Sequence, residues 1–180
     1  MVTVLIGCSG WSYDDWVGRF YPIDLAKKKE EWLRYYANYF STVEINSTFY
    51  RPPNEFIVNS WIKKGKELKG FEYSVKMPQL ITHDSLVNGK MDAVASQASS
   101  FENVCVKPLA GENLLGTVLI QMSPYFRKEG DSLKHLSDLF SAVSCLQYRY
   151  AVEFRHRSWL DDSGNELDPK VLEILADNNV

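Results

Sequence analysis

Four short apolar segments of this sequence carry charged or amide side chains close to their carboxyl ends. The residues concerned are Glu44, Asn46, Lys76, Gln121, Glu153 and Arg155. Two glutamates in different surroundings suit general acid and base catalysis, because those surroundings separate their pKa values. A lysine and an arginine beside them would hold an anionic group, the arginine through its forked donors. The residue types therefore indicate a polar site for a small ligand.

Alternation along the segments places these polar residues on one face. In Thr42–Asn46, Val43 and Ile45 have one parity while Glu44 and Asn46 have the other, and the other three segments repeat this arrangement. Successive strand residues point to opposite faces, so helices would cover the apolar face only. In a parallel barrel the polar face is the interior, and its C-terminal rim carries the chemistry. The alternatives are a buried charge network that sets strand register, or a solvated sheet face.

Two of the three histidines lie just beyond predicted strands, where a general acid or base would work. His83 follows the predicted strand Phe71–Lys76, and His156 follows the predicted strand Tyr148–Arg155. A metal site that joins them to Glu44 and Glu153 is not predicted, because Glu153 and His156 are three residues apart and would point to opposite faces. No H-E-x-x-H spacing is present. The sequence leaves any cofactor unknown.

The loops beside these segments are rich in glycine and aromatic residues. Gly7–Trp11 is a glycine-rich turn whose N–H groups are able to face an anion. It matches neither a G-x-G-x-x-G nor a Walker motif, and a plain tight turn is the simpler explanation. Trp11, Tyr50 and Trp159 would stack on a sugar or a base, or else fill the packing of the loops.

The elements that must position these residues alternate between strand and helix. Strands are predicted at Val4–Cys8, Thr42–Asn46, Phe71–Lys76, Thr117–Gln121 and Tyr148–Arg155. Helices are predicted at Lys28–Phe40, after an N-cap at Asn54, at Met91–Val106 with a stop at Pro108, from Asp131, and after the cap Asp168-Pro169. This alternation predicts an α/β, TIM-barrel-like (β/α) repeat with parallel strands. Residues 1–180 would form a single domain with the first five or six units present and the C-terminal units missing, since eight units at this spacing need about 290 residues.

Composition narrows the class of protein further. The 180 residues are 45% hydrophobic and 24% charged, with a net charge of −3, so neither nucleic acid nor an anionic membrane is a default partner. Three widely spaced cysteines without a C-x-x-C pair are typical of a reducing compartment. No signal peptide or membrane span is predicted, and we expect a cytoplasmic protein.

Several segments resemble the YecE-like family, a domain of unknown function. The chain contains, in the family's order, GCSGWSY, FYP, YYANYFSTVEINSTFYRPP, FEYSVKMPQLITH, QMSPYF and YAVEFRHRSW. The resemblance implies a TIM-barrel-like fold of about 240 residues or more, which would continue past Val180. It implies no particular reaction. The positions that match the family's characteristic residues are Ser9, Gly10, Trp11, Glu44, Asn46, Tyr50, Lys76, His83, Gln121, Glu153, Arg155, His156 and Trp159.

The leading hypothesis is an enzyme that acts on a small polar, anionic or carbohydrate-like substrate at the C-terminal rim, with a hydrolase or an isomerase as the possible type. The expected catalytic residues are Glu44, Lys76, His83 and Glu153. The expected substrate-binding residues are Ser9, Trp11, Asn46, Tyr50, Gln121, Arg155, His156 and Trp159.

Two other hypotheses remain open at the level of sequence. One is a non-catalytic module that binds a metabolite or a nucleic-acid end through its aromatic loops and Arg155, although the overall acidity counts against nucleic acid. The other is an inert fragment whose open sheet edge promotes self-association.

Overall fold

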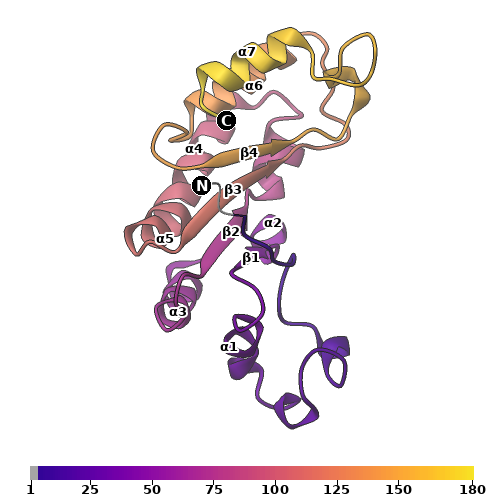
Figure 1. Ribbon diagram of the computed structural model, residues 1–180. Helices are drawn as coiled ribbons and strands as arrows, with labels where there is room; N and C mark the ends of the chain where they lie inside the picture. Colours follow the sequence, from indigo (N-terminus) through magenta and orange to yellow (C-terminus); the bar gives the residue numbers. More distant parts are fainter. Residues whose placement is uncertain (1–3) are drawn as a thin grey trace.

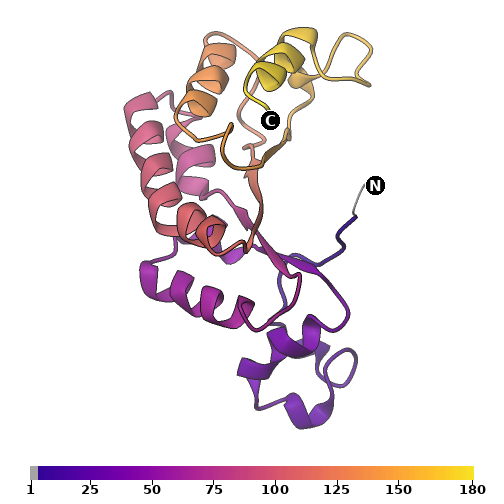
Figure 2. The same ribbon diagram turned by 60° about the vertical axis from the view of Figure 1, so that its left-hand side comes forward.

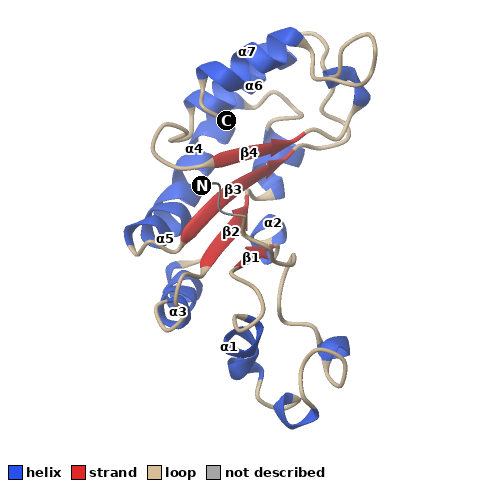
Figure 3. Cartoon of the chain, in the orientation of Figure 1, coloured by secondary structure: helices blue, strands red, loops and turns tan. Residues whose placement is uncertain are grey.

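The computed structural model describes residues 4–180, which form a four-stranded parallel sheet with helices on one face (Figures 1 and 3). The strands, in the same order along the chain and across the sheet, are β1 (Thr42–Ile45), β2 (Glu72–Lys76), β3 (Leu115–Gln121) and β4 (Tyr150–Glu153). Their bounds differ from the predicted ones by no more than two residues at either end. The predicted α/β class with parallel strands is confirmed.

Helices connect the strands and cover one side of the sheet, as the view in Figure 2 shows. The α-helices are α1 (Trp32–Tyr36), α2 (Ser47–Tyr50), α3 (Glu55–Gly65), α4 (Met91–Phe101), α5 (Lys107–Gly111), α6 (Ser132–Ser141) and α7 (Pro169–Asp177). Tighter 3-10 turns lie at Asp14–Trp16, Ile23–Leu25, Lys29–Glu31 and Arg157–Trp159, and wider π-turns at Leu80–Ser85 and Glu102–Val106. Within residues 4–180, no helix combines the length and the apolar character that crossing a membrane requires.

The core lies between the sheet and these helices. β-branched and aromatic residues occupy every second strand position and are almost completely buried: Val43, Ile45, Tyr73, Val75, Val118 and Ile120. The helices contribute side chains such as Val58, Val94, Ala98 and Leu136 to the same core. Removing this apolar surface from water is the main favourable contribution to folding, and it requires the polar strand residues to take the opposite face.

Two helix starts follow directly from their capping residues. The Oδ1 atom of Asn54 accepts a hydrogen bond of 3.0 Å from the backbone N of Ile57, and α3 begins at Glu55, directly after Asn54. Asp168 accepts from the backbone N of Lys170 at 2.9 Å, with Pro169 as the first residue of α7. Both caps satisfy N–H groups that have no partner within the helix, as the sequence predicted.

Pro108 does not end a helix, and that prediction is wrong. The backbone stays helical from Met91 to Gly111, because a π-turn at Glu102–Val106 lies between α4 and α5. Pro108 occupies the first turn of α5. A regular α-helix would use the N–H that proline lacks at this position, and the π-turn directly before Pro108 is a local departure from that regular pattern.

Two other elements differ from their prediction. The segment Val4–Cys8 forms no strand in the described chain, although the carbonyl of Cys8 accepts a hydrogen bond of 3.0 Å from the backbone N of Glu44. Val4 and Ile6 are exposed, so the apolar run that predicted a strand is not buried. The helix predicted at Lys28–Phe40 is reduced to a 3-10 turn followed by α1. Its aromatic residues form a cluster with Phe20 and Tyr21, and Trp32 and Tyr36 of this cluster are buried as part of the core.

That aromatic cluster holds the first loop beside β1. Tyr21 stacks on Trp32 with ring centres 4.8 Å apart, and its hydroxyl donates to the carbonyl of Trp11. The hydroxyl of Tyr36 donates to the carbonyl of Thr42 at 3.0 Å and accepts from the backbone N of Cys8 at 2.6 Å. The chain around residues 8–11 is therefore fixed against the start of β1.

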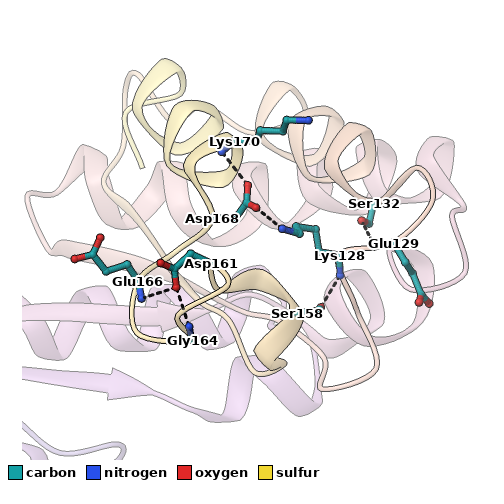
Figure 4. A network of polar contacts seen from close by, with 9 residues as sticks. All are labelled: Lys128, Glu129, Ser132, Ser158, Asp161, Gly164, Glu166, Asp168 and Lys170. Carbon is teal, nitrogen blue, oxygen red and sulfur yellow. Dashed lines mark hydrogen bonds and ion pairs between the residues drawn. The ribbon is translucent and has the colours of Figure 1, made fainter.

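A polar network holds the loops after β3 and β4 together (Figure 4). Lys128 forms an ion pair with Asp168, and its backbone N donates to the hydroxyl of Ser158 at 2.8 Å. The nearby turn is closed by Asp161, whose Oδ1 accepts from the backbone N of Gly164 at 2.9 Å. The two contacts of Lys128 span 40 and 30 residues of sequence, so Lys128 fixes both the start of α7 and the loop that follows Glu153.

Candidate functional site

The polar face predicted from alternation exists. Backbone register places Glu44 opposite Ser74, Lys76 opposite Leu119 and Gln121 opposite Glu153, so the paired side chains share a face. In β1, β2 and β3 the alternate positions are buried beneath the helices, and in β4 Val152 is half-buried. The polar groups therefore lie on the face that the helices leave open, at the carboxyl ends of the strands.

Lys76 is the most unusual of these residues, because its side chain is only 9% exposed and has no anionic partner. Its Nζ atom lies 3.3 Å from Oδ1 of Asn46 and 5.0 Å from the centre of the Phe49 ring. No ion pair within residues 4–180 includes Lys76. Burying an ammonium group costs several kcal/mol unless a counter-charge is near, so this arrangement is suited to an external anion.

The backbone of Lys76 is fixed by Thr48, the second residue of α2. The hydroxyl of Thr48 donates to the carbonyl of Lys76 at 2.7 Å and lies 3.1 Å from its backbone N. The same hydroxyl is 2.8 Å from the carbonyl of Ile45. Thr48 is fully buried in α2, so it joins the carboxyl ends of β1 and β2 and sets the position from which Lys76 extends.

A second group joins β3 and β4. The Oε2 atom of Glu153 accepts a hydrogen bond of 2.7 Å from the amide of Gln121, and Oε1 lies 3.0 Å from Nε of Arg155. Arg155 also donates to Oε1 of Gln121 at 3.3 Å. The arginine and glutamate side chains are 47% and 42% exposed, so this ion pair adds little stability. It orients both groups, and it leaves donors of the guanidinium available to a ligand.

Glu44 has a hydroxyl partner from the first loop. The Oγ atom of Ser9 donates to Oε1 of Glu44 at 2.6 Å. The two residues are 35 positions apart in sequence, and the aromatic cluster described above holds the loop that brings them together. This bond orients the carboxylate of Glu44 towards the first loop at the carboxyl end of β1.

His83 lies close to both cationic groups. Partial burial, together with the positive charges of Arg155 and Lys76, lowers the pKa of His83 below its ordinary value of 6.5. Its Nδ1 atom is 2.9 Å from the hydroxyl of Thr82, and its ring packs edge-on against Phe49 with centres 5.0 Å apart. At neutral pH the imidazole is therefore uncharged, with one nitrogen bonded to Thr82 and the other free to exchange a proton.

Two predicted ligand-binding residues make structural contacts within the fold. Trp159 is fully buried between Phe126 and Phe154, and its indole N–H donates to the carbonyl of Phe126 at 2.7 Å. The prediction that Trp159 stacks on a ligand is therefore wrong, because both of its faces are already covered. The Nδ1 atom of His156 accepts from the backbone N of Ser158 at 3.1 Å and caps the turn at Arg157–Trp159.

The other two aromatic predictions lie on the surface. Trp11 is half-buried and Tyr50 is 67% exposed, and both line an open hollow of about 510 Å³ next to Asn46. Their rings are accessible there, in contrast to that of Trp159. Whether a ligand stacks on them stays a prediction.

One buried carboxylate was not predicted from the sequence. Glu102 is 4% exposed and accepts hydrogen bonds from the backbone N of Ser144 at 2.6 Å, the hydroxyl of Ser144 at 2.9 Å and the hydroxyl of Tyr150 at 2.5 Å. Three donors satisfy the carboxylate without a cation, so it joins the helical layer to the start of β4. The signal in the sequence was the position of Glu102, a charged residue at the spacing of the core residues in the helix predicted at Met91–Val106.

The described residues contain no group of three or more histidine, cysteine, aspartate or glutamate side chains placed to hold a metal ion.

A parallel sheet with helices on one face and polar side chains at its carboxyl ends defines a class of α/β protein whose sites lie at strand ends. Comparison with known families identifies the family within this class. The family model described as "Protein of unknown function DUF72" matches residues 5–180, and the chain belongs to that family.

Individual relatives agree with this assignment. The chain is 28% identical over 159 residues to the UPF0759 protein YunF of Bacillus subtilis (strain 168), which covers 87% of this chain and 52% of that protein. It therefore spans about half the length of this curated relative.

Solved structures give the same fold. A DUF72 family protein of Thermotoga maritima MSB8 is 28% identical, and its structure matches with a TM-score of 0.78. The match covers 98% of this chain and 62% of that one. A DUF72 family protein of Enterococcus faecalis V583, 20% identical, has a TM-score of 0.73 with coverage of 98% and 58%. The four strands and their helices thus correspond to part of a TIM-barrel-like fold.

Proposed function

We propose that the carboxyl ends of β1–β4 form the substrate-binding part of an enzyme site for a small anionic substrate. The observation that carries this proposal is the buried ammonium group of Lys76, which contacts an amide and an aromatic ring but forms no ion pair with any of residues 4–180. An anion bound there would remove the unfavourable burial of an unpaired charge. Since the chain spans about half the length of its curated relative, the proposal concerns these strand ends and not a complete protein.

The surrounding groups have roles that suit proton transfer. Glu44, already bonded to a hydroxyl, is the general base, and the donors that Arg155 leaves free give the substrate a second cationic contact. His83, whose pKa is lowered, exchanges a proton in its neutral form. A carboxylate base close to a bound anion supports a hydrolase or an isomerase, because both reaction types begin with proton removal from water or from the substrate.

Turnover of a defined panel tests this proposal. The purified chain is incubated with sugar phosphates and hydroxy acids, and each compound is followed by mass spectrometry. We expect one or more compounds to be consumed, with loss of at least a hundredfold in rate for Glu44→Gln and for Lys76→Met. The matched control is Glu173→Gln, an exposed glutamate on α7. Equal rates in all four proteins would contradict the assigned roles.

Binding without turnover is the outcome that favours the second candidate function, a non-catalytic module. The exposed aromatic rings of the first loop and α2 support that candidate. In that case Lys76→Met would abolish binding, while Glu44→Gln would leave it unchanged.

A further inference from the structure

An open hollow of about 510 Å³ lies beside the polar strand ends. Its walls come from the first loop, from α2 and from α3, and they are mainly aromatic and aliphatic: Trp11, Tyr13, Ile45, Tyr50, Ile57 and Trp61. Tyr13, Tyr50 and Ile57 are exposed, which leaves apolar surface in contact with water. Such a concave apolar surface is typical of a binding site for the ring of a small ligand.

Asn46 connects this hollow to Lys76. It lines the hollow, and its Oδ1 atom lies 3.3 Å from Nζ of Lys76. One side chain therefore separates the apolar surface from the ammonium group. Lys76 itself does not line the hollow, so a ligand that rests there would extend its charged group past Asn46 to reach the ammonium group.

The first loop gives the hollow a second connection, to Glu44. The hydroxyl of Tyr13 donates to the carbonyl of Ser9, whose own hydroxyl is bonded to Glu44. Gly10 lies between them with φ of +110°, and a Cβ at that position would approach the hydroxyl of Tyr13 to 2.4 Å. Glycine is thus required for Tyr13 to fold back over the loop and form a wall of the hollow.

We propose that the hollow binds a planar ring carried by the same ligand whose anionic group is held by Lys76. The ligand class is a small ring-bearing anion, such as an aromatic carboxylate. This inference rests on the proposed anion site, because it assigns the rest of the ligand that the site would hold. The ring covers apolar surface against Trp11, and the anion supplies the charge that complements Lys76.

Three probes separate the two halves of the proposed ligand. Benzoate carries a ring and a charge, acetate carries the charge alone, and benzyl alcohol carries the ring alone. Isothermal titration calorimetry of the full 180-residue chain is expected to show benzoate binding at least tenfold more tightly than either of the others, since one ring stacked on an aromatic side chain accounts for about tenfold in affinity.

Variants then assign each half to its residue. Trp11→Ala is expected to weaken benzoate about tenfold and to leave acetate unchanged, whereas Lys76→Met is expected to weaken both anions and to leave benzyl alcohol unchanged. Trp11→Phe keeps a ring at this position and should bind benzoate within about threefold of the unaltered chain. Phe56→Ala is the matched control, because Phe56 is an 82% exposed aromatic residue of α3 that does not line the hollow.

The outcomes distinguish this inference from the proposed function. Equal affinity for acetate and benzoate, both lost in Lys76→Met, would support the anion site and overturn the ring inference. Tight benzoate binding that Lys76→Met does not weaken would overturn the anion site and the joint ligand together. No detectable binding of benzoate at 20 mM, or an effect of Phe56→Ala equal to that of Trp11→Ala, would overturn the ring inference. Circular dichroism of each variant establishes that it is folded.

Discussion

The ammonium group of Lys76 lies 3.3 Å from the amide oxygen of Asn46, and this contact joins the ends of β1 and β2. A neutral amide oxygen compensates only part of the free energy lost when an ammonium group leaves water. Among residues 4–180, the buried ammonium group therefore has an amide and a ring as partners but no ion pair. If Lys76 binds an anion as proposed, its charge is kept for binding at the expense of stability, which gives the first prediction.

Replacing Lys76 with methionine should stabilise the fold. The substitution keeps the length and the apolar stem of the side chain but removes the buried charge, so we expect the free energy of unfolding to rise by about 1 kcal/mol. Urea denaturation followed by circular dichroism measures this change. Lys63→Met, at an exposed lysine of α3, is the control and should change stability by less than about 0.5 kcal/mol. A destabilised Lys76→Met protein would show that the ammonium group is already satisfied.

The titration of His83 should respond to the charge of Lys76. Burial is the larger cause of its lowered pKa and the charges of Arg155 and Lys76 are the smaller ones, so Lys76→Met should raise the pKa while leaving it below 6.5. NMR of the imidazole Cε1–H signal, assigned with His83→Gln, gives both values. Lys63→Met should leave the titration unchanged, and a His83 pKa above 6.5 in the unaltered chain would contradict this description.

The same lowered pKa predicts a dependence of stability on pH. As pH falls below about 6.5, the unfolded chain binds a proton at this histidine before the folded chain does, so the contribution of His83 to stability decreases. We expect the loss of stability between pH 7 and pH 5.5 to be smaller in His83→Gln than in the unaltered chain. Equal losses in the two proteins would exclude a contribution from His83.

Removing the carboxylate of Glu102 should strongly destabilise the fold. In Glu102→Ala the backbone N of Ser144 and the hydroxyl of Tyr150 lose their partner in a buried region, which we expect to cost about 2–4 kcal/mol. Thermal and urea denaturation measure this cost. Glu173→Ala, at an exposed position of α7, should be nearly neutral. A cost below about 1 kcal/mol would mean that water replaces the carboxylate.

The outer edge of β4 should promote self-association. Within residues 4–180, β4 pairs with β3 alone, through contacts that include the carbonyls of Arg149 and Glu153. Ladder bonds alternate sides along a strand, so the N–H of Val152 points to the unpaired edge. We expect sedimentation velocity to show dimers at micromolar concentration and Val152→Pro to shift the chain towards monomer, because proline removes that donor. A strictly monomeric unaltered chain would contradict this prediction.

The sequence by itself determined the parallel α/β class and the face of each strand. Val43 and Ile45 alternate with Glu44, and local alternation of this kind follows from strand geometry, without knowledge of tertiary contacts. The same holds for the caps at Asn54 and Asp168, where one side chain bonds to a backbone group two or three residues away.

Tertiary structure decided which side chains meet. Ser9 reaches Glu44 across 35 residues because an aromatic cluster fixes the first loop, and Trp159 is covered by Phe126, which lies 33 residues earlier, as well as by the nearby Phe154. The π-turn that carries the helix past Pro108 also depends on packing, because residue preferences alone favour a stop there. Local rules describe a residue's own backbone and the direction of its side chain. Burial and pairing depend on residues far away in sequence, and only the folded chain specifies them.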